Sequence, residues 1–118
     1  MSKTKKQDDS PLAVRRCHEL LLWLIPLLDQ FPRNRRFTLG ERIESGLLDI
    51  LRLLVEAAYS RQKQNTLRQA NLTLATVRHL WRLTFELKVI NSKRFEHGAR
   101  LMLELGAQIG GWQKSVSK

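Results

Sequence analysis

The stretch FPRNRRFTLGERI, residues 31–43, separates two runs of helically spaced apolar residues, so it decides where one helix ends and the next begins. Within it, TLGE is a helix-start signal, because the Thr38 hydroxyl can cap backbone N–H groups and the Glu41 carboxylate can reach back to the cap. The connection ahead of this signal holds three arginines, Arg33, Arg35 and Arg36. A helix N-terminus already carries partial positive charge, so these cations are unfavourable there unless an anion lies close by.

On both sides of this stretch apolar residues recur at helical spacing, and no segment alternates apolar and polar residues as a strand would. The pattern predicts four helices, over residues 11–30, 38–60, 65–90 and 92–113, the last of them capped by Ser92. The predicted buried stripes of these helices are Cys17, Leu21, Leu24, Leu28 and Phe31; Leu39, Ile43, Leu47, Ile50, Leu54 and Ala57; Leu67, Leu74, Val77, Trp81 and Phe85; and Phe95, Met102, Leu105, Ile109 and Trp112.

Short connections between helices of similar length are typical of one architecture. They predict an all-α fold, an up-down-up-down four-helix bundle over residues 11–113. Residues 1–10 and 114–118 are polar and without period, and we expect them to be disordered tails.

Length and composition limit the classes of function. The chain has 118 residues, enough for one domain, and a formal net charge of +10. Such an excess indicates a polyanionic partner, which is nucleic acid, an acidic membrane surface or an acidic protein. The apolar run from Leu20 to Leu28 is shorter than the ~20 residues that span a bilayer. The basic and apolar positions also do not form one isolated amphipathic helix, so no membrane partner is expected. The single cysteine, Cys17, excludes an internal disulfide and favours a reducing, cytoplasmic setting.

Two helices carry more apolar surface than a lone bundle needs. Leu22 and Trp23 are predicted to face away from the core stripe of the first helix, and the third helix carries a second apolar line that ends at Ile90. The candidate oligomer-interface residues are Leu22, Trp23, Leu72, Leu80, Leu83 and Leu87. They favour a homo-oligomer over the alternative of scattered exposed leucines, which any protein surface can carry.

The remaining sector of the third helix is basic. Its residues follow one another at three- and four-residue steps: Arg68, Asn71, Ala75, Arg78 and Arg82. Between Glu56 and Glu86 the chain has no acidic residue at all, whereas a solvated face normally mixes both signs. We therefore expect this line to bind phosphates or an acidic partner rather than to be merely a soluble face.

No catalytic or metal-binding constellation is present in the sequence. His18, His79 and His97 lie on three different predicted helices without a Cys or carboxylate cluster at metal spacing, so each is interpreted as a surface or packing residue. The glycines of the fourth helix lack the pattern of a phosphate-binding loop and are interpreted as close-packing positions or as a sign of fraying near the helix end. The sequence predicts a protein that is not an enzyme and that needs no metal and no cofactor.

The chain resembles the accessory variability determinant of diversity-generating retroelements over about residues 11–113. The residues that fall where such a family motif would have them are Phe31, Pro32, Arg33, Arg36, Phe37, Thr38, Leu39, Gly40 and Arg42. It is also distantly similar to the proteins encoded in bacterial ribosomal-RNA intervening sequences, which share the aromatic-Pro-basic opening of the second helix. Those relatives carry an Asn-Ile-Ala-Glu-Gly-like turn near the end of that helix, where this chain reads EAAYSRQKQN, residues 56–65, so the retroelement branch is favoured.

The resemblance implies a barrel-like homopentamer of four-helix bundles that binds the retroelement reverse transcriptase and supports the copying of template RNA into mutagenised cDNA. The candidate contacts to polymerase, RNA or DNA are Arg33, Arg35, Arg36, Arg68, Arg78 and Arg82. The alternative that stays open is a stand-alone basic RNA-binding bundle of the intervening-sequence type.

Overall fold

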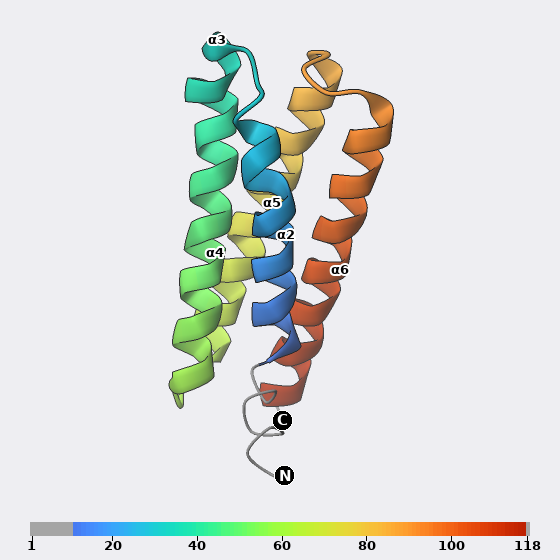
Figure 1. Cartoon of the computed structure of the whole chain (residues 1–118). Coiled ribbons are helices and arrows are strands. Elements are labelled where there is room, and N and C mark those ends of the chain that lie inside the picture. The colour runs from blue at the N-terminus through green and yellow to red at the C-terminus, as the bar shows by residue number, and fades with distance from the viewer. Residues whose placement is uncertain (1–10, 118) are drawn as a thin grey trace, which may run out of the picture.

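Four long helices, joined by short connections, run alternately up and down (Figure 1). The structure is a computed structural model, and it describes residues 11–117. Its elements are α2 (Leu12–Leu28), α3 (Arg33–Arg35), the π-helical turn η1 (Arg36–Gly40), α4 (Glu41–Tyr59), α5 (Gln64–Glu86) and α6 (Ser92–Val116). Because α3, η1 and α4 follow one another without a break, they form one helix, and the predicted four-helix bundle is confirmed. The tail predicted at residues 1–10 lies outside the described residues.

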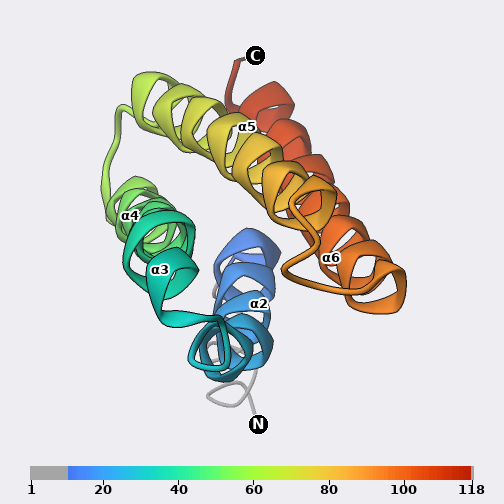
Figure 2. The same cartoon turned by 90° about the horizontal axis from the view of Figure 1, so that it is seen from above.

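The helices pack as a ring in which each one lies against two antiparallel neighbours (Figure 2). α2 lies between α4 and α6, and α5 lies between the same two helices on the other side. Among the helices described, none combines the length and the hydropathy that crossing a bilayer requires.

The core follows the predicted stripes closely. Leu39, Phe85, Phe95 and Trp112 are half-buried, and all the other predicted core residues are buried. Cys17 is fully buried, its thiol donates a hydrogen bond to the Leu47 carbonyl at 3.7 Å, and burial raises its pKa to about 12. The cysteine is therefore a small core residue that ties α2 to α4.

The start of the second helix differs from the prediction. The helix begins at Arg33, five residues before the predicted start, because the Pro32 carbonyl accepts hydrogen bonds from the N–H groups of Arg35 and Arg36, each at 2.8 Å. Thr38 lies inside η1, where its hydroxyl donates to the Asn34 carbonyl at 2.9 Å instead of capping a terminus. The predicted Thr38–Glu41 capping box is thus wrong, and the three arginines lie on the first turns of the helix rather than before it.

The link between α5 and α6 also differs from the prediction. α5 ends at Glu86, not Ile90, because Lys88 adopts φ 64° and the chain turns there. The N–H of Val89 donates to the Thr84 carbonyl at 3.0 Å and that of Lys88 to the Phe85 carbonyl at 2.9 Å, the two bonds of a Schellman C-cap.

Both ends of α6 fall outside the predicted limits. Asn91 is its N-cap, in place of Ser92, since the Asn91 side chain accepts the Arg94 N–H at 2.8 Å. α6 then continues to Val116 rather than to Gln113, because Trp112 and Val116 pack against the core. Residues 114–116, predicted to belong to a tail, are therefore helical.

Candidate functional site

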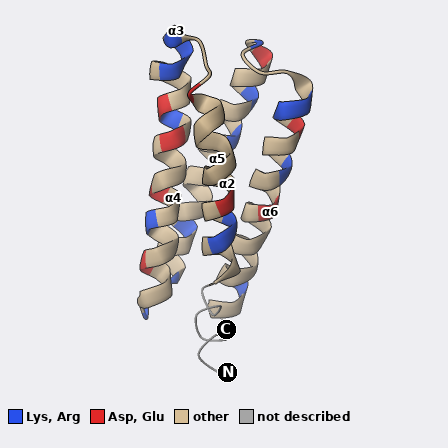
Figure 3. Ribbon diagram, in the orientation of Figure 1, with Lys and Arg blue, Asp and Glu red and all other residues tan. Residues whose placement is uncertain are grey.

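The candidate arginines lie at two places on the bundle: the basic opening of the second helix, Arg33, Arg35 and Arg36, and the α5 line of Arg68, Arg78 and Arg82. Figure 3 shows the basic opening at the upper end of the ribbon, at α3. In both places arginines occupy an exposed or half-buried helix surface, but they differ in how far carboxylates neutralise them.

In the basic opening, one of the three arginines is neutralised. Arg36 contacts Glu44 at 3.0 Å and Asp29 at 3.4 Å, and only 23% of its side chain is exposed. Arg36 is neutralised because the end of α2 and the start of α4 bring two carboxylates to it. Arg33 is exposed and Arg35 half-buried, and neither has an acidic partner among the described residues.

The α5 line borders a groove between α5 and α6. Two adjoining cavities of about 400 Å³ and 410 Å³ share Ala75 and Arg78 as lining residues. Arg82 and His79 line the first cavity, whereas Arg68 and Asn71 line the second. α6 contributes Phe95, Ala99, Met102, Gly106 and Gln113. We call this concave surface the α5–α6 groove, and it places basic groups along one edge of a largely apolar floor.

The partners of the basic residues along the groove differ. Arg82 pairs with Glu86 one turn later at 3.1 Å, so this arginine of the line is neutralised. Asn71 donates to the Gln113 side chain at 2.7 Å and ties α5 to α6. Arg68 and Arg78 are exposed without an acidic partner among residues 11–117. The groove therefore carries free positive charge mainly at these two residues.

A close contact at one end of the groove holds α6 against α5. A Cβ on Gly98 would lie 2.6 Å from the nearest Trp81 ring atom, so only glycine lets the helix backbone approach this buried ring. The Trp81 indole N–H donates to the Phe95 carbonyl at 3.0 Å, and the Phe95 ring stacks on Phe85 with centroids 4.5 Å apart. The predicted packing role of Gly98 is thus confirmed.

The candidate oligomer-interface residues are not equally accessible. Leu22, Leu72, Leu83 and Leu87 are exposed, whereas Leu80 is half-buried against the core. The predicted outward orientation of Trp23 is wrong, because its ring lies edge-on to Trp81 at 6.1 Å and to His97 at 4.7 Å between centroids. α6 packs against α2, and the helical pattern had assigned no neighbouring helix to that side of α2.

The structure exposes apolar side chains that the sequence argument missed. They are Leu12, Phe37, Leu48, Val55, Tyr59 and Leu103. Leu48, Val55 and Tyr59 repeat at helical spacing along α4, a signal that was present in the sequence. No sequence signal identifies the α6 residues of the groove, because the helix that lies beside the α5 line is set by packing.

The histidines show no shared site. His97 packs on Trp23 and its Nδ1 lies 3.0 Å from an Arg100 guanidinium nitrogen, while His18 and His79 are exposed. In the part of the chain that the structure describes, no group of three or more His, Cys, Asp or Glu residues could hold a metal ion.

Comparison with known proteins places this architecture in a family. No curated protein matches the chain significantly. A family model described as bAvd-like matches residues 12–116, which is nearly the whole of the four-helix bundle. The chain therefore belongs to the bAvd-like family, the bacterial accessory variability determinants.

Proposed function

We propose that this protein is the non-catalytic accessory subunit of a diversity-generating retroelement, where it holds the reverse transcriptase and nucleic acid together during mutagenic cDNA synthesis. The observation that carries the proposal is the bAvd-like family match over residues 12–116. The free arginines at the α5–α6 groove, Arg68 and Arg78, support it as an electrostatic surface.

The nucleic-acid part of the proposal rests on charge. Guanidinium groups bind phosphate oxygens through paired N–H donors, and they do so without reading the sequence. The net charge of +10 adds a long-range attraction that steers RNA or DNA to the surface. Binding through these groups is expected to show little sequence preference and to weaken steeply as salt rises.

The proposal includes self-association as a homopentamer. Leu22, Leu72, Leu83 and Leu87 leave apolar surface exposed on α2 and α5, and a second copy could bury it. Light scattering after size exclusion tests this, with Leu22→Glu and Leu72→Glu as variants that place a charge on each surface. A monodisperse particle of one-chain mass, 13.8 kDa, at micromolar concentration would contradict the oligomer.

The partner is tested by co-purification. The protein is expressed with the reverse transcriptase and template RNA of its retroelement, either unchanged or with Arg68, Arg78 and Arg82 all replaced by Glu. We expect the triple variant to lose polymerase binding and cDNA synthesis, because the exchange replaces the positive charge of the α5 line with negative charge. The fold should be retained, since the exchanged residues are exposed and lie away from the core. Arg52→Glu, an exposed arginine of α4, is the matched control and should retain both activities.

Two outcomes would redirect the proposal. If the triple variant keeps its helicity, its oligomer size and its polymerase activity, the α5 line is only a solvated face. If the unchanged protein binds RNA but never the polymerase, a stand-alone RNA-binding bundle is the better description.

A further inference from the structure

An exposed aromatic ring lies in the middle of the basic opening. Phe37 is 63% exposed, although it belongs to the π-helical turn η1 between two regular helical segments. Among the aromatic residues of the described chain, only Phe37 and Tyr59 are exposed. An exposed phenyl ring in a π-helical turn requires an explanation, since π turns occur frequently at functional sites.

The ring is held beside a fixed cation. The guanidinium carbon of Arg36 lies 6.0 Å from the centroid of the Phe37 ring. Arg36 is itself held by Glu44 at 3.0 Å and Asp29 at 3.4 Å, so it is not free to bind a phosphate. Arg36 therefore positions the ring, while most of the ring surface stays open to solvent.

Free positive charge precedes the ring. Arg33 stands one helical turn before Phe37 and therefore lies on the same face, whereas Arg35, two residues before Phe37, lies on another face of this turn. Neither arginine has a carboxylate partner among the described residues, and the first turn of α3 holds no acidic residue. Glu41 follows one turn later and is exposed, whereas the carboxylates of Asp29 and Glu44 are paired with Arg36.

We propose that Phe37 is a stacking platform for an unpaired nucleobase, with Arg33 binding a phosphate beside it on the same helix face and Arg35 adding positive charge to the same turn. This inference rests on the proposed function and names its substrate class as single-stranded nucleic acid. An aromatic ring stacks on any base, but only where the strand is unpaired and the face of the base can be reached. In a duplex the base faces are covered by neighbouring pairs, and only the phosphates remain for the arginines.

A protein partner is the competing occupant, because aromatic residues and arginines are also common at the centre of protein interfaces. The charge of the surface favours the polyanion. The two unpaired arginines of this turn are cations, and they occupy the positive end of a helix dipole, where a phosphate is stabilised and a protein surface without acidic groups gains nothing.

The test compares single-stranded and duplex RNA on the full-length protein. Fluorescence anisotropy is recorded with a labelled 12-nucleotide oligouridine and with a blunt duplex of the same length. Phe37→Leu keeps an apolar side chain but removes the stacking face, and it is expected to weaken oligouridine binding about tenfold and duplex binding less than about twofold. Phe37→Trp should restore the affinity for oligouridine.

Tyr59→Leu is the matched control. Tyr59 is the other exposed aromatic residue, and it lies at the opposite end of the second helix from the basic opening. Its replacement should leave both affinities within about twofold, since no stacking role is assigned to it. Circular dichroism and thermal melting should match the unchanged protein for every variant, because these rings are not part of the core.

Salt dependence separates stacking from charge. Phe37→Leu should lower the affinity by the same factor at every salt concentration, whereas Arg33→Gln should reduce the slope of log K against log salt by about 0.7, the value for one phosphate of a single strand.

Each contrary outcome has one meaning. Equal losses on both RNAs, or no loss from Phe37→Leu, would overturn the platform while leaving the proposed accessory function intact. Loss of polymerase binding with unchanged oligouridine affinity would assign Phe37 to the protein partner and would also overturn it. If the unchanged protein binds neither RNA at low salt, the nucleic-acid part of the proposed function fails together with the platform.

Discussion

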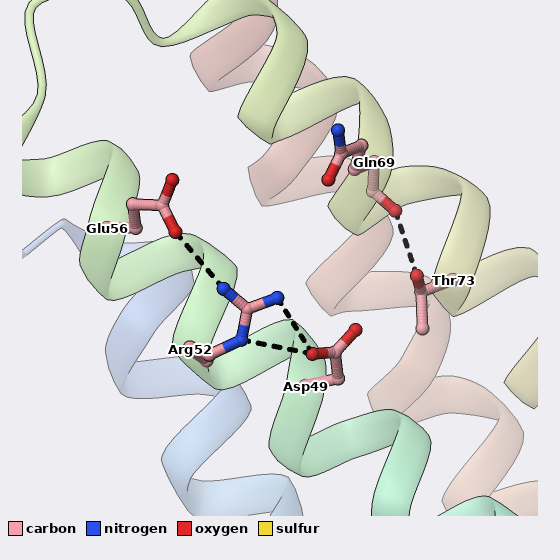
Figure 4. Close-up of polar contacts among 5 residues, drawn as sticks. All are labelled: Asp49, Arg52, Glu56, Gln69 and Thr73. Carbon is pink, nitrogen blue, oxygen red and sulfur yellow. Dashed lines mark hydrogen bonds and ion pairs between the residues drawn. The ribbon is translucent and has the colours of Figure 1, made fainter.

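The surface of α4 beside α5 and the surface between α5 and α6 use arginines differently. On the α4 side the charged groups neutralise one another within one helix: Arg52 contacts Asp49 at 3.0 Å and Glu56 at 3.1 Å (Figure 4). The neighbouring Thr73 hydroxyl donates to the Gln69 carbonyl of its own helix at 3.0 Å. This side is polar, but its groups have partners.

On the α6 side, Arg82 is the one arginine of the α5 line that is paired within the described chain, with Glu86 at 3.1 Å. Arg68 and Arg78 have no carboxylate partner among residues 11–117, and the surface between the helices is hollowed into the α5–α6 groove. An arginine therefore does not by itself mark a binding surface. What distinguishes the two sides is whether a carboxylate lies one helical turn away and whether the surface is concave.

The largest effect on stability is expected from removing the Trp81 ring, which is buried and lines the α5–α6 groove. Trp81→Ala should lower the free energy of unfolding by about 3–5 kcal/mol, because Trp81 is buried and its indole hydrogen bond to Phe95 is lost as well. Val77→Ala, on the α4 side of the same helix, should cost about 2 kcal/mol, since fewer methyl groups are removed. Urea titration followed by circular dichroism measures both, and equal losses would contradict the distinction.

The two glycine contacts sharpen the same comparison. A Cβ on Gly98 would meet three atoms of the Trp81 ring at 2.6–2.8 Å, whereas one on Gly46 would meet a single Val77 methyl at 2.6 Å. We expect Gly98→Ala to destabilise the fold by about 2 kcal/mol and Gly46→Ala by about half as much, because a rigid buried ring yields less than one methyl group. Thermal unfolding of both variants checks the order, and a larger loss for Gly46→Ala would reverse it.

A smaller effect concerns RNA affinity. Arg78→Gln should weaken oligouridine binding about fivefold at low salt and reduce the salt slope by about 0.7, because one phosphate contact is lost. Arg52→Gln removes an arginine that is already paired, so it should change the affinity less than about twofold. Anisotropy titrations across a series of salt concentrations give both quantities, and equal effects of the two variants would show that only net charge matters.

The smallest effect comes from freeing a paired arginine. Glu86→Gln removes the partner of Arg82 at the rim of the groove, so we expect RNA to bind about twofold more tightly. The matched change on α4, Glu56→Gln, leaves Arg52 paired with Asp49 and should have no measurable effect. Tighter binding by both variants to the same extent would argue against a local role for the groove.

Most of the helical architecture could be predicted, but the ends of the helices could not. The apolar repeats from Cys17 to Phe31 and from Ile43 to Ala57 identified buried faces correctly, since helical periodicity is a local property. The predicted helix ends were wrong where two local signals competed. Pro32 and Thr38 can both begin a helix, and only the hydrogen bonds of the Pro32 carbonyl show which one does.

The candidate site was predictable to a lesser degree. The α5 line and the basic opening were identified as charge, but the partners of Arg36 and Arg82 were missed. Glu86 stands one turn from Arg82, so that pair was visible in the sequence. The contact of Arg36 with Asp29 crosses a chain reversal, and no local pattern predicts it.

By itself, the sequence determined four amphipathic helices, a strongly basic chain and membership of the bAvd-like family, because each depends on the kind and spacing of residues along the chain. Only the tertiary structure decided that Trp23 packs on Trp81, that α6 completes the groove beside Arg78, and that Phe37 faces solvent. The reason is that helical spacing states which residues share a face, while the neighbour that covers or exposes that face is set by how all the helices pack together.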